Sequence, residues 1–155
     1  MAHLVAPQSS KPTLPVFYNV DAVVGAAPAT NNREDVLLVQ FAFAAMAANP
    51  LPGASKEFYN AISAVKPTGT IDQATVWAIK ATQIEVKKSQ PGTVVDGRVS
   101  PATGGYGYGG GGLFTITHIN ESLQHRYLDH WPRIDKIPGC PLEIKQMVVR
   151  TVQGT

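Results

Sequence analysis

The stretch Gly69-Thr70-Ile71-Asp72-Gln73-Ala74-Thr75 decides the fold, because the chain uses its pattern twice. A second copy, Gly97-Arg98-Val99-Ser100-Pro101-Ala102-Thr103, begins 28 residues later. In both copies a Gly, a β-branched residue, an Ala and a Thr stand at the same offsets. This offset is about the length of one helix with its connection, so the chain contains a small internal repeat.

Each copy has the composition of a tight turn that leads into a helix. Glycine supplies the backbone freedom of a sharp turn, and the β-branched residue two positions later is expected in a core. Asp72 or Ser100 then offers a side-chain oxygen to an N–H group of the first helical turn. Pro101 suits the first position of a helix, where its missing N–H has no cost. Both copies are therefore predicted to open helices.

The order of motifs around these turns resembles the peptidoglycan-binding-like domain family. The segments that carry the resemblance are Val24-Gly25, residues 32–40, Gly69-Thr70-Ile71-Asp72, Ala78-Ile79 with Gln83, and residues 96–101. The resemblance covers residues 23–104. It implies a compact three-helix unit that recognises the muramyl-peptide part of the cell wall through a shallow groove near its turns. By position, the candidate ligand-binding residues are Asp96, Arg98, Tyr106 and Tyr108.

Apolar periodicity predicts three helices in this unit. The first spans residues 33–48 with Asn32 as its N-cap, the second residues 55–65 and the third residues 73–88. Trp77 falls at helical spacing with other apolar residues, which favours a place in the core over a sugar-stacking platform. Replacing it with Ala is then expected to cost about 3–5 kcal/mol. The residues predicted to face the core are Val36, Val39, Phe43 and Ala47; Phe58, Ile62 and Val65; and Ala74, Trp77, Ala81 and Ile84.

The segments before and after this unit are predicted to be attachments. Prolines in residues 1–22 predict an extended arm with at most one short strand. The glycines and tyrosines of residues 105–112 are typical of a flexible linker. Residues 113–155 are predicted to form a small strand-helix-helix extension, so the fold class is mainly α.

Within that extension, residues 113–119 are rich in β-formers and predict a strand. Residues 121–131 predict a helix with Asn120 as its cap, and residues 142–152 a last helix opened by Pro141. A lone strand needs a partner. That partner is either the amino-terminal arm or another chain, and the second option makes a homo-oligomer through the termini.

Composition and charge exclude several classes of protein. A net charge of +2, with 13 scattered Lys and Arg residues, disfavours nucleic acid as a partner. No segment approaches the roughly 20 apolar residues of a membrane span, and the first residues lack the pattern of a secretory signal. We expect synthesis in the cytoplasm without a Sec signal, followed by action in a particle or apparatus, or at the cell wall after non-classical release.

No residue pattern indicates an enzyme, a metal or a cofactor. Cys140 is the only cysteine, and a structural thiol is expected. His118, His125 and His130 lack the spacing of a zinc helix, so no metal site is predicted. Serine and carboxylate contexts give neither a nucleophile elbow nor a glycosidase pair.

Two functions remain open on these grounds. The first is a non-catalytic binding module for bacterial peptidoglycan, as the resemblance implies. The second is a structural subunit of a phage, a virion or a contractile injection assembly, in which the same fold makes protein–protein contacts. An adaptor or immunity partner of a secreted toxin is a third possibility that no feature specifically requires.

Overall fold

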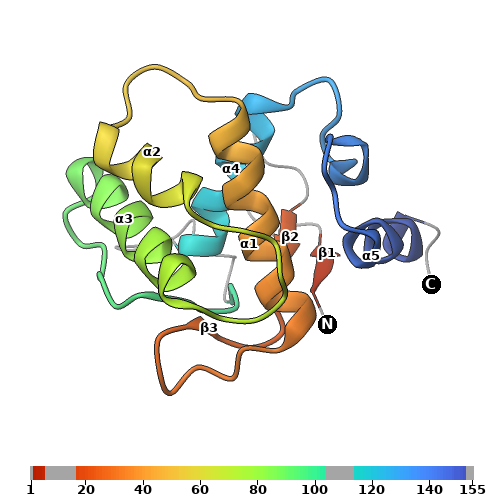
Figure 1. The fold of residues 1–155 in the computed structure, drawn as a ribbon, viewed down its shortest axis with the longest axis horizontal. Helices are drawn as coiled ribbons and strands as arrows, with labels where there is room; N and C mark the ends of the chain where they lie inside the picture. The colour runs from red at the N-terminus through yellow and green to blue at the C-terminus, as the bar shows by residue number, and fades with distance from the viewer. Residues whose placement is uncertain (1, 6–16, 104–113, 153–155) are drawn as a thin grey trace.

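The computed structural model describes residues 2–5, 17–103 and 114–152 of the 155-residue chain. The predicted linker at residues 105–112 lies outside the described residues. The described part of the chain is mainly helical, as the sequence predicts (Figure 1). Its elements are, in order, β1 (His3–Val5), β2 (Phe17–Asn19), β3 (Val24–Gly25), α1 (Arg33–Ala48), α2 (Lys56–Ser63), α3 (Gln73–Ser89), β4 (Arg98–Val99), α4 (Thr115–Arg126), the 3₁₀ helix η2 (Ile134–Lys136) and α5 (Leu142–Val152).

Two small antiparallel sheets join segments that lie far apart in the sequence. β1 pairs with β2, with Leu4 opposite Tyr18, and β3 pairs with β4, with Val24 opposite Val99. The prediction of at most one short strand in the arm is therefore wrong. The two strands at the amino terminus form a sheet with each other.

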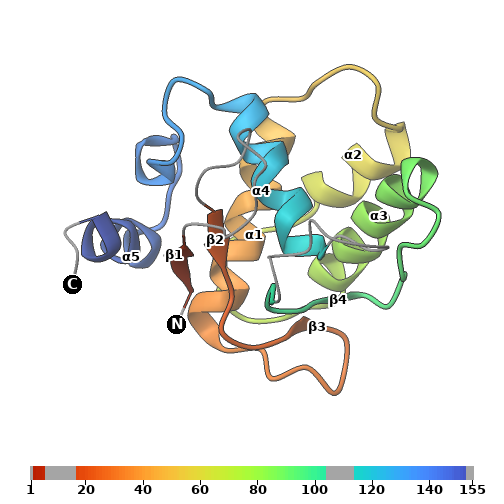
Figure 2. The same cartoon turned by 180° about the vertical axis from the view of Figure 1, so that it is seen from behind.

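α1 is the central helix of the molecule. Figures 1 and 2 show it between the α2–α3 pair on one side and the β1–β2 sheet with α5 on the other. Its predicted bounds are confirmed, but every side chain from Asp35 to Phe43 is buried, not one stripe alone. The sequence pattern predicts a narrower apolar face because it considers only three helices, whereas α4 and α5 cover further faces of α1.

α2 and α3 have nearly the predicted bounds, but α3 presents a different face to the core. Ser55 caps α2, and Phe58, Ile62 and Val65 are buried as predicted. The inner face of α3 consists of Thr75, Ala78, Ile79, Ala81, Thr82 and Gln83.

Trp77 and Ile84 are thus on the outer side of α3, and their predicted place in the core is wrong. Trp77 is 59% exposed and Ile84 is 47% exposed. The cost predicted for Trp77→Ala assumed a buried side chain, so it does not apply to this exposed tryptophan. A hydropathy pattern does not predict the polar members of the inner face, because hydrogen bonds satisfy them there: Thr75 bonds to Gln40, Thr82 to Ala78 O and Gln83 to the turn at Gly97.

The strand predicted at residues 113–119 is also wrong, since α4 begins at Thr115. Ile116, Ile119 and Leu123 are spaced for one helical face and are buried against the core. This packing overrides the strand preference of the Thr and Ile residues. α4 ends at Arg126, five residues before the predicted end.

Asn120 lies within α4 and does not cap it. The side chain is buried, and its Oδ1 accepts a hydrogen bond from Tyr18 N at 2.6 Å. Its Nδ2 donates to the carbonyl oxygens of Tyr18 and Ile116, both at 2.8 Å. Asn120 therefore fastens β2 to α4.

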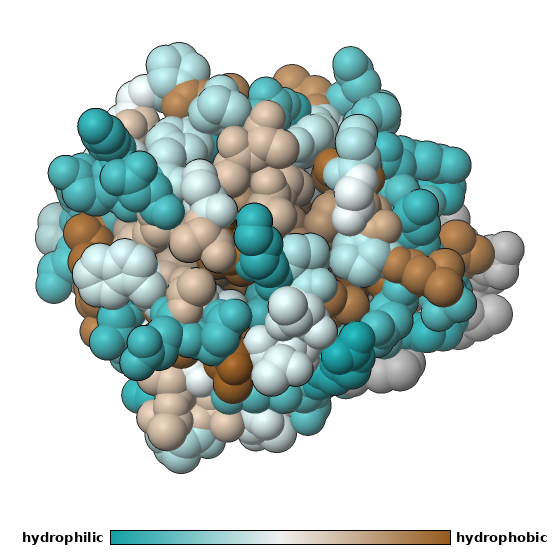
Figure 3. All heavy atoms as spheres, viewed as in Figure 1, coloured by the Kyte–Doolittle hydropathy of each residue, from teal (hydrophilic) through white to brown (hydrophobic). Residues whose placement is uncertain are grey.

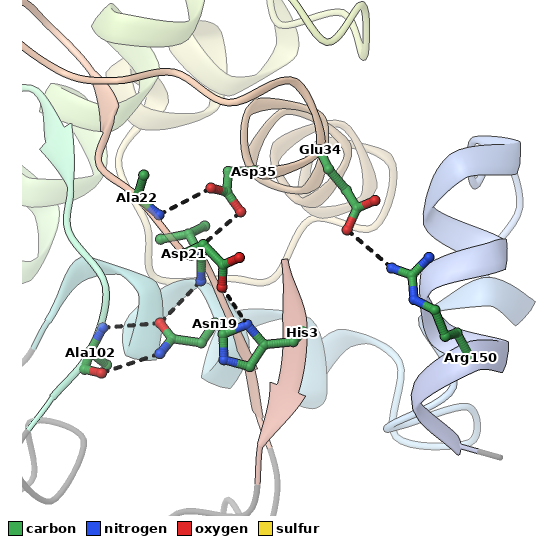
Figure 4. A network of polar contacts seen from close by, with 9 residues as sticks. His3, Asn19, Asp21, Ala22, Glu34, Asp35, Ala102 and Arg150 are labelled. Atoms are coloured by element: carbon green, nitrogen blue, oxygen red, sulfur yellow. Dashed lines mark hydrogen bonds and ion pairs between the residues drawn. The ribbon is translucent and has the colours of Figure 1, made fainter. Parts of the chain in front are cut away.

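A second polar network holds the start of α1 (Figure 4). Asp35 is fully buried, and its two carboxylate oxygens accept hydrogen bonds from the N–H groups of Asp21 and Ala22, each at 3.1 Å. Asn19 binds both backbone groups of Ala102, at 3.0 and 3.2 Å. The chain after β4 is thereby tied to β2, and it does not form the helix predicted to open at Pro101.

One cluster of buried apolar residues forms the core. It contains Phe17 from β2, Ile79 from α3, Ile116 from α4 and Ile144 from α5, together with most of α1. α5 has the predicted bounds, with Met147 and Val148 buried. Segments outside residues 23–104 thus contribute to the same core as the three predicted helices.

Candidate functional site

Two buried glutamines hold the two repeated turns in the same way. Gln40 of α1 accepts hydrogen bonds at Oε1 from the N–H groups of Thr68 and Gly69, at 3.0 and 2.8 Å. Its Nε2 donates to Thr70 O at 2.9 Å and to Thr75 Oγ1 at 3.0 Å. The first turn then leads into α3 as predicted, because the Asp72 side chain caps Thr75 N at 2.8 Å.

Gln83 of α3 repeats this arrangement at the second turn. Its Oε1 accepts from Asp96 N and Gly97 N at 3.0 and 2.9 Å, and its Nε2 donates to Arg98 O at 2.9 Å. The threonine that completes this set is Thr115 of α4, whose Oγ1 lies 3.2 Å from Nε2. The second copy was predicted to lead directly into a helix, as the first does. Instead, the threonine bonded to Gln83 belongs to α4, which lies farther along the chain.

A pocket lies beside the first turn, between the connection from β3 to α1 and the outer side of α3. We call it the Trp77 groove, and its volume is about 730 Å³. Figure 3 shows this face, where pale brown spheres gather over the loop at its lower edge. The groove is lined by Gly25, Ala26, Ala27, Ala29, Asn31, Ile71, Asp72, Gln73, Val76, Trp77 and Lys80.

Asn31 fixes the loop that forms one wall of the Trp77 groove. It has a positive φ of 56°, and its Oδ1 accepts from Gly25 N at 2.7 Å. Its Nδ2 donates to Gly25 O at 3.1 Å and to Ala29 O at 3.4 Å. The loop wall is therefore held by local hydrogen bonds of the Asn31 side chain.

Close backbone packing at the β3–β4 pair forms the base of this region. A Cβ on Gly25 would lie 2.1 Å from Gly97 O, so only glycine allows this approach. A Cβ on Gly97 would lie 2.9 Å from Cε of Lys80, which shows that the Lys80 stem runs over Gly97. The repeated glycine thus positions a charged side chain of the groove.

Asp96 and Arg98, two of the predicted site residues, lie together at a different pocket. Asp96 Oδ1 accepts from Arg98 N at 3.0 Å, and Asp96 Oδ2 is 3.8 Å from Arg98 Nε. Their pocket has a volume of about 260 Å³. Tyr106 and Tyr108 lie outside the described residues, so the structure does not place them.

The groove residues Trp77, Lys80 and Asp72 were missed as a site by sequence reasoning. Trp77 was assigned to the core on hydropathy alone. The sequence does contain a signal for the true inner face, because Thr75, Thr82 and Gln83 are spaced for the face of the helix opposite Trp77. Thr75 belongs to the first repeated turn, and Gln83 is one of the residues that carry the resemblance. Placing those polar residues inside would have turned Trp77 outward.

Two other kinds of site are the Cys140 thiol and groups of side chains that could bind a metal. Burial raises the pKa of the Cys140 thiol to about 12, so this thiol is protonated at neutral pH. Within residues 2–5, 17–103 and 114–152, no group of three or more His, Cys, Asp or Glu side chains could hold a metal ion. None of the helices in this described part has the length and hydropathy to cross a membrane.

The chain was also compared with known proteins. No protein-family model, no curated protein and no solved structure matches this chain.

Proposed function

We propose that this chain is a non-catalytic module that binds bacterial peptidoglycan through the Trp77 groove. The observation that carries the proposal is a tryptophan that is 59% exposed and lines a pocket of about 730 Å³. So large an aromatic surface contributes little to the core when it faces solvent. It is well suited to pack against a ligand, and an indole is a strong contributor to binding energy.

The composition of the groove supports a binding role. Its walls are mostly small apolar residues, with a few polar groups from Asp72, Gln73 and Lys80. A preformed apolar pocket with few polar groups is the usual form of a ligand site. The loop wall is fixed by Asn31, so little ordering is needed when a ligand binds.

The resemblance in sequence is the reason for naming peptidoglycan. The segments that carry it include the turns at Gly69 and Gly97, residues 32–40, which end at Gln40, and Gln83. These four residues make one recurring arrangement of hydrogen bonds. The same resemblance places ligand-binding residues near the turns, where both the Trp77 groove and the pocket of Asp96 and Arg98 lie.

Co-sedimentation with purified sacculi tests this proposal. We expect the parent protein to sediment, and Trp77→Ala to weaken binding roughly tenfold or more. Leu128→Ala is the matched control, because Leu128 is a large apolar residue that is 68% exposed and lies outside the groove. Arg98→Ala tests the smaller pocket. A parent protein that stays in the supernatant at low salt contradicts the proposal.

A second candidate, a structural subunit of a larger assembly, is favoured by one face of α5. Leu142 and Val149 lie two turns apart on this helix and are 68% and 39% exposed. Such a pair on one face suits contact with another subunit. Light scattering after size-exclusion chromatography tests this candidate, since a strict monomer at high concentration contradicts self-assembly through α5. A Leu142→Ser variant should dissociate an oligomer if one forms.

A further inference from the structure

We infer that the carboxyl end of α3 and the loop after it bind the surface of an anionic lipid bilayer. Ile84, Val94 and Val95 pack among the lipid headgroups, and Lys87 and Lys88 contact the phosphates. We call these five residues the α3 patch. The inference goes beyond the proposed function, because none of the five lines the Trp77 groove. Attachment of this kind involves one leaflet and needs no membrane-spanning helix.

Exposed apolar side chains are concentrated at the α3 patch. Val94 is 70% exposed, Ile84 is 47% exposed and Val95 is 37% exposed. Together with Trp77, they are four of the eight large apolar residues that are exposed within residues 2–5, 17–103 and 114–152. Apolar surface gains free energy when it is removed from water, and a cluster of it on a folded chain indicates a binding surface.

Hydrogen bonds hold the loop beside α3. The N–H groups of Asp96 and Gly97, which directly follow Val95, donate to Oε1 of Gln83 at 3.0 and 2.9 Å. Gln83 directly precedes Ile84 on the helix. Figures 1 and 2 show the loop along the outer edge of the molecule, next to α3. The loop therefore runs back along the helix, with Val95 close to the turn that carries Ile84.

The lysines supply the positive charge that an anionic surface attracts. Lys87 and Lys88 are exposed, and they follow Ile84 by three and four residues, which places them on the same side of the helix. Lys87 has no ion pair within the part of the chain that the structure describes, whereas Lys88 pairs with Glu85 at 2.8 Å. Lys80, four residues before Ile84, adds a further positive charge on this side.

The composition of the α3 patch favours a lipid surface over a second protein. Lysine is depleted in protein interfaces, where aromatic residues and arginine are enriched. The patch combines lysines with aliphatic side chains and contains neither arginine nor an aromatic residue. Near an anionic bilayer, in contrast, each lysine strengthens binding roughly fivefold. The lysine stem lies along apolar surface while its ammonium group reaches the phosphates.

Co-sedimentation of the full chain with lipid vesicles tests the inference. The vesicles contain equal amounts of phosphatidylcholine and phosphatidylglycerol, and vesicles of phosphatidylcholine alone serve as the comparison. We expect the parent protein to bind the anionic vesicles more tightly, and high salt to weaken this binding. Val94→Ser should weaken it roughly tenfold, because a buried valine is lost. Lys87→Gln should weaken it roughly fivefold.

Matched control variants are available outside the α3 patch. Leu128→Ser removes an apolar side chain that is 68% exposed, and Lys145→Gln removes an exposed lysine of α5. Both should bind the anionic vesicles as the parent does. A parent protein that does not bind these vesicles at low salt overturns the inference. Control variants that weaken binding as much as the patch variants also overturn it.

Two further results separate the inference from the proposed function and from a protein contact. Val94→Ser should sediment with sacculi as the parent does, because Val94 lies outside the Trp77 groove. Vesicle binding without sedimentation on sacculi supports the inference and removes the proposed function, whereas the reverse result overturns the inference alone. An oligomer that Val94→Ser dissociates, in a protein that does not bind vesicles, shows a protein contact at the patch and overturns the inference.

Discussion

At the scale of single residues, the repeated turns depend on partners that are distant in sequence. The positive φ values of Gly69 and Gly97, 81° and 71°, agree with the turns predicted from their composition. Their glutamine partners come from α1 and α3. Composition could predict the glycines because their requirement is local. The hydrogen bonds of Gln40 and Gln83 depend on the folded arrangement, so only the resemblance pointed to these residues.

Replacing Gln83 by Ala should strongly destabilise the protein. The change leaves the buried Gly97 N–H and the neighbouring Asp96 N–H without their acceptor and removes the link to Thr115. We expect the free energy of unfolding to fall by about 2–4 kcal/mol, measured by urea denaturation. Gln146→Ala, at an exposed position of α5, should change it by less than about 0.5 kcal/mol. Equal effects of the two changes would contradict this role for Gln83.

Glycine is required at position 25 because of close packing and at position 53 only because of its backbone angle. Gly25→Ala places a Cβ 2.1 Å from Gly97 O and should cost more than about 3 kcal/mol. Gly53 has a φ of 101° and no heavy atom within 4 Å of its added Cβ, so Gly53→Ala should cost about 1–2 kcal/mol. Urea denaturation of both variants measures the difference, and similar costs would rule out the packing argument.

At the scale of elements, helix bounds were predicted more reliably than helix faces. The bounds of α1 and α5 match the prediction, with Asn49-Pro50 after α1 and Pro141 before α5, although the side chain of Asn32 at the N-cap position of α1 makes no cap hydrogen bond. The predicted face of α3 was wrong because Ala74, Trp77, Ala81 and Ile84 are also spaced for one helical face, whereas the buried face combines Ala78 and Ile79 with polar residues. The strand predicted at residues 113–119 is wrong for the first part of α4, whose β-branched residues are compatible with both structures, because the packing against α1 that decides between them is not local.

The buried carboxyl of Asp35, at the start of α1, should make the free energy of unfolding depend on pH. Burial is the main cause that raises the pKa of Asp35, against the opposing effect of the hydrogen bond from Ala22 N–H. Because the folded protein then holds this proton more tightly than the unfolded chain, the contribution of Asp35 to stability falls as pH rises from about 3.9 to its raised pKa. Urea denaturation of the parent and of Asp35→Asn across this range measures the difference.

That difference in unfolding free energy, parent minus Asp35→Asn, should be larger at the acid end of the range and level off above it. Asp135 acts in the opposite direction, because Arg133 lowers its pKa and its contribution is lost as pH falls. The Asp135 term is present in both proteins and cancels in the comparison. A difference that increases with pH would show that the carboxylate of Asp35 is stabilised in the fold.

At the scale of the whole molecule, one core joins the predicted three-helix unit to both ends of the chain. α5 contacts β1, and it also forms ion pairs with α1 through Arg33–Glu143 at 2.7 Å and Glu34–Arg150 at 3.3 Å. The sequence predicted that attachments exist but not how they pack. Their docking depends on contacts between residues more than a hundred positions apart, which no local pattern contains.

Apolar packing, more than the ion pairs, should hold α5 in place. Ile144 is fully buried in the core, and Ile144→Ala should cost about 2–5 kcal/mol. Glu143→Gln breaks an exposed pair with Arg33 and should leave the unfolding midpoint nearly unchanged, because water and salt screen such pairs. Urea denaturation at low and high salt tests both changes. A large, salt-dependent loss in Glu143→Gln would reverse this assignment.

The burial of α1 on nearly all sides also provides a way to measure ligand affinity by hydrogen exchange. Amide protons in a helix whose side chains from Asp35 to Phe43 are all buried are expected to exchange with solvent only when the whole molecule opens. Their exchange rates therefore report global stability, and a ligand that binds only the folded state slows them by the factor 1 + [L]/Kd. Amides of the loop at residues 25–31 can exchange through smaller openings. Deuterium uptake at these two places would give the affinity and the location of binding in one experiment.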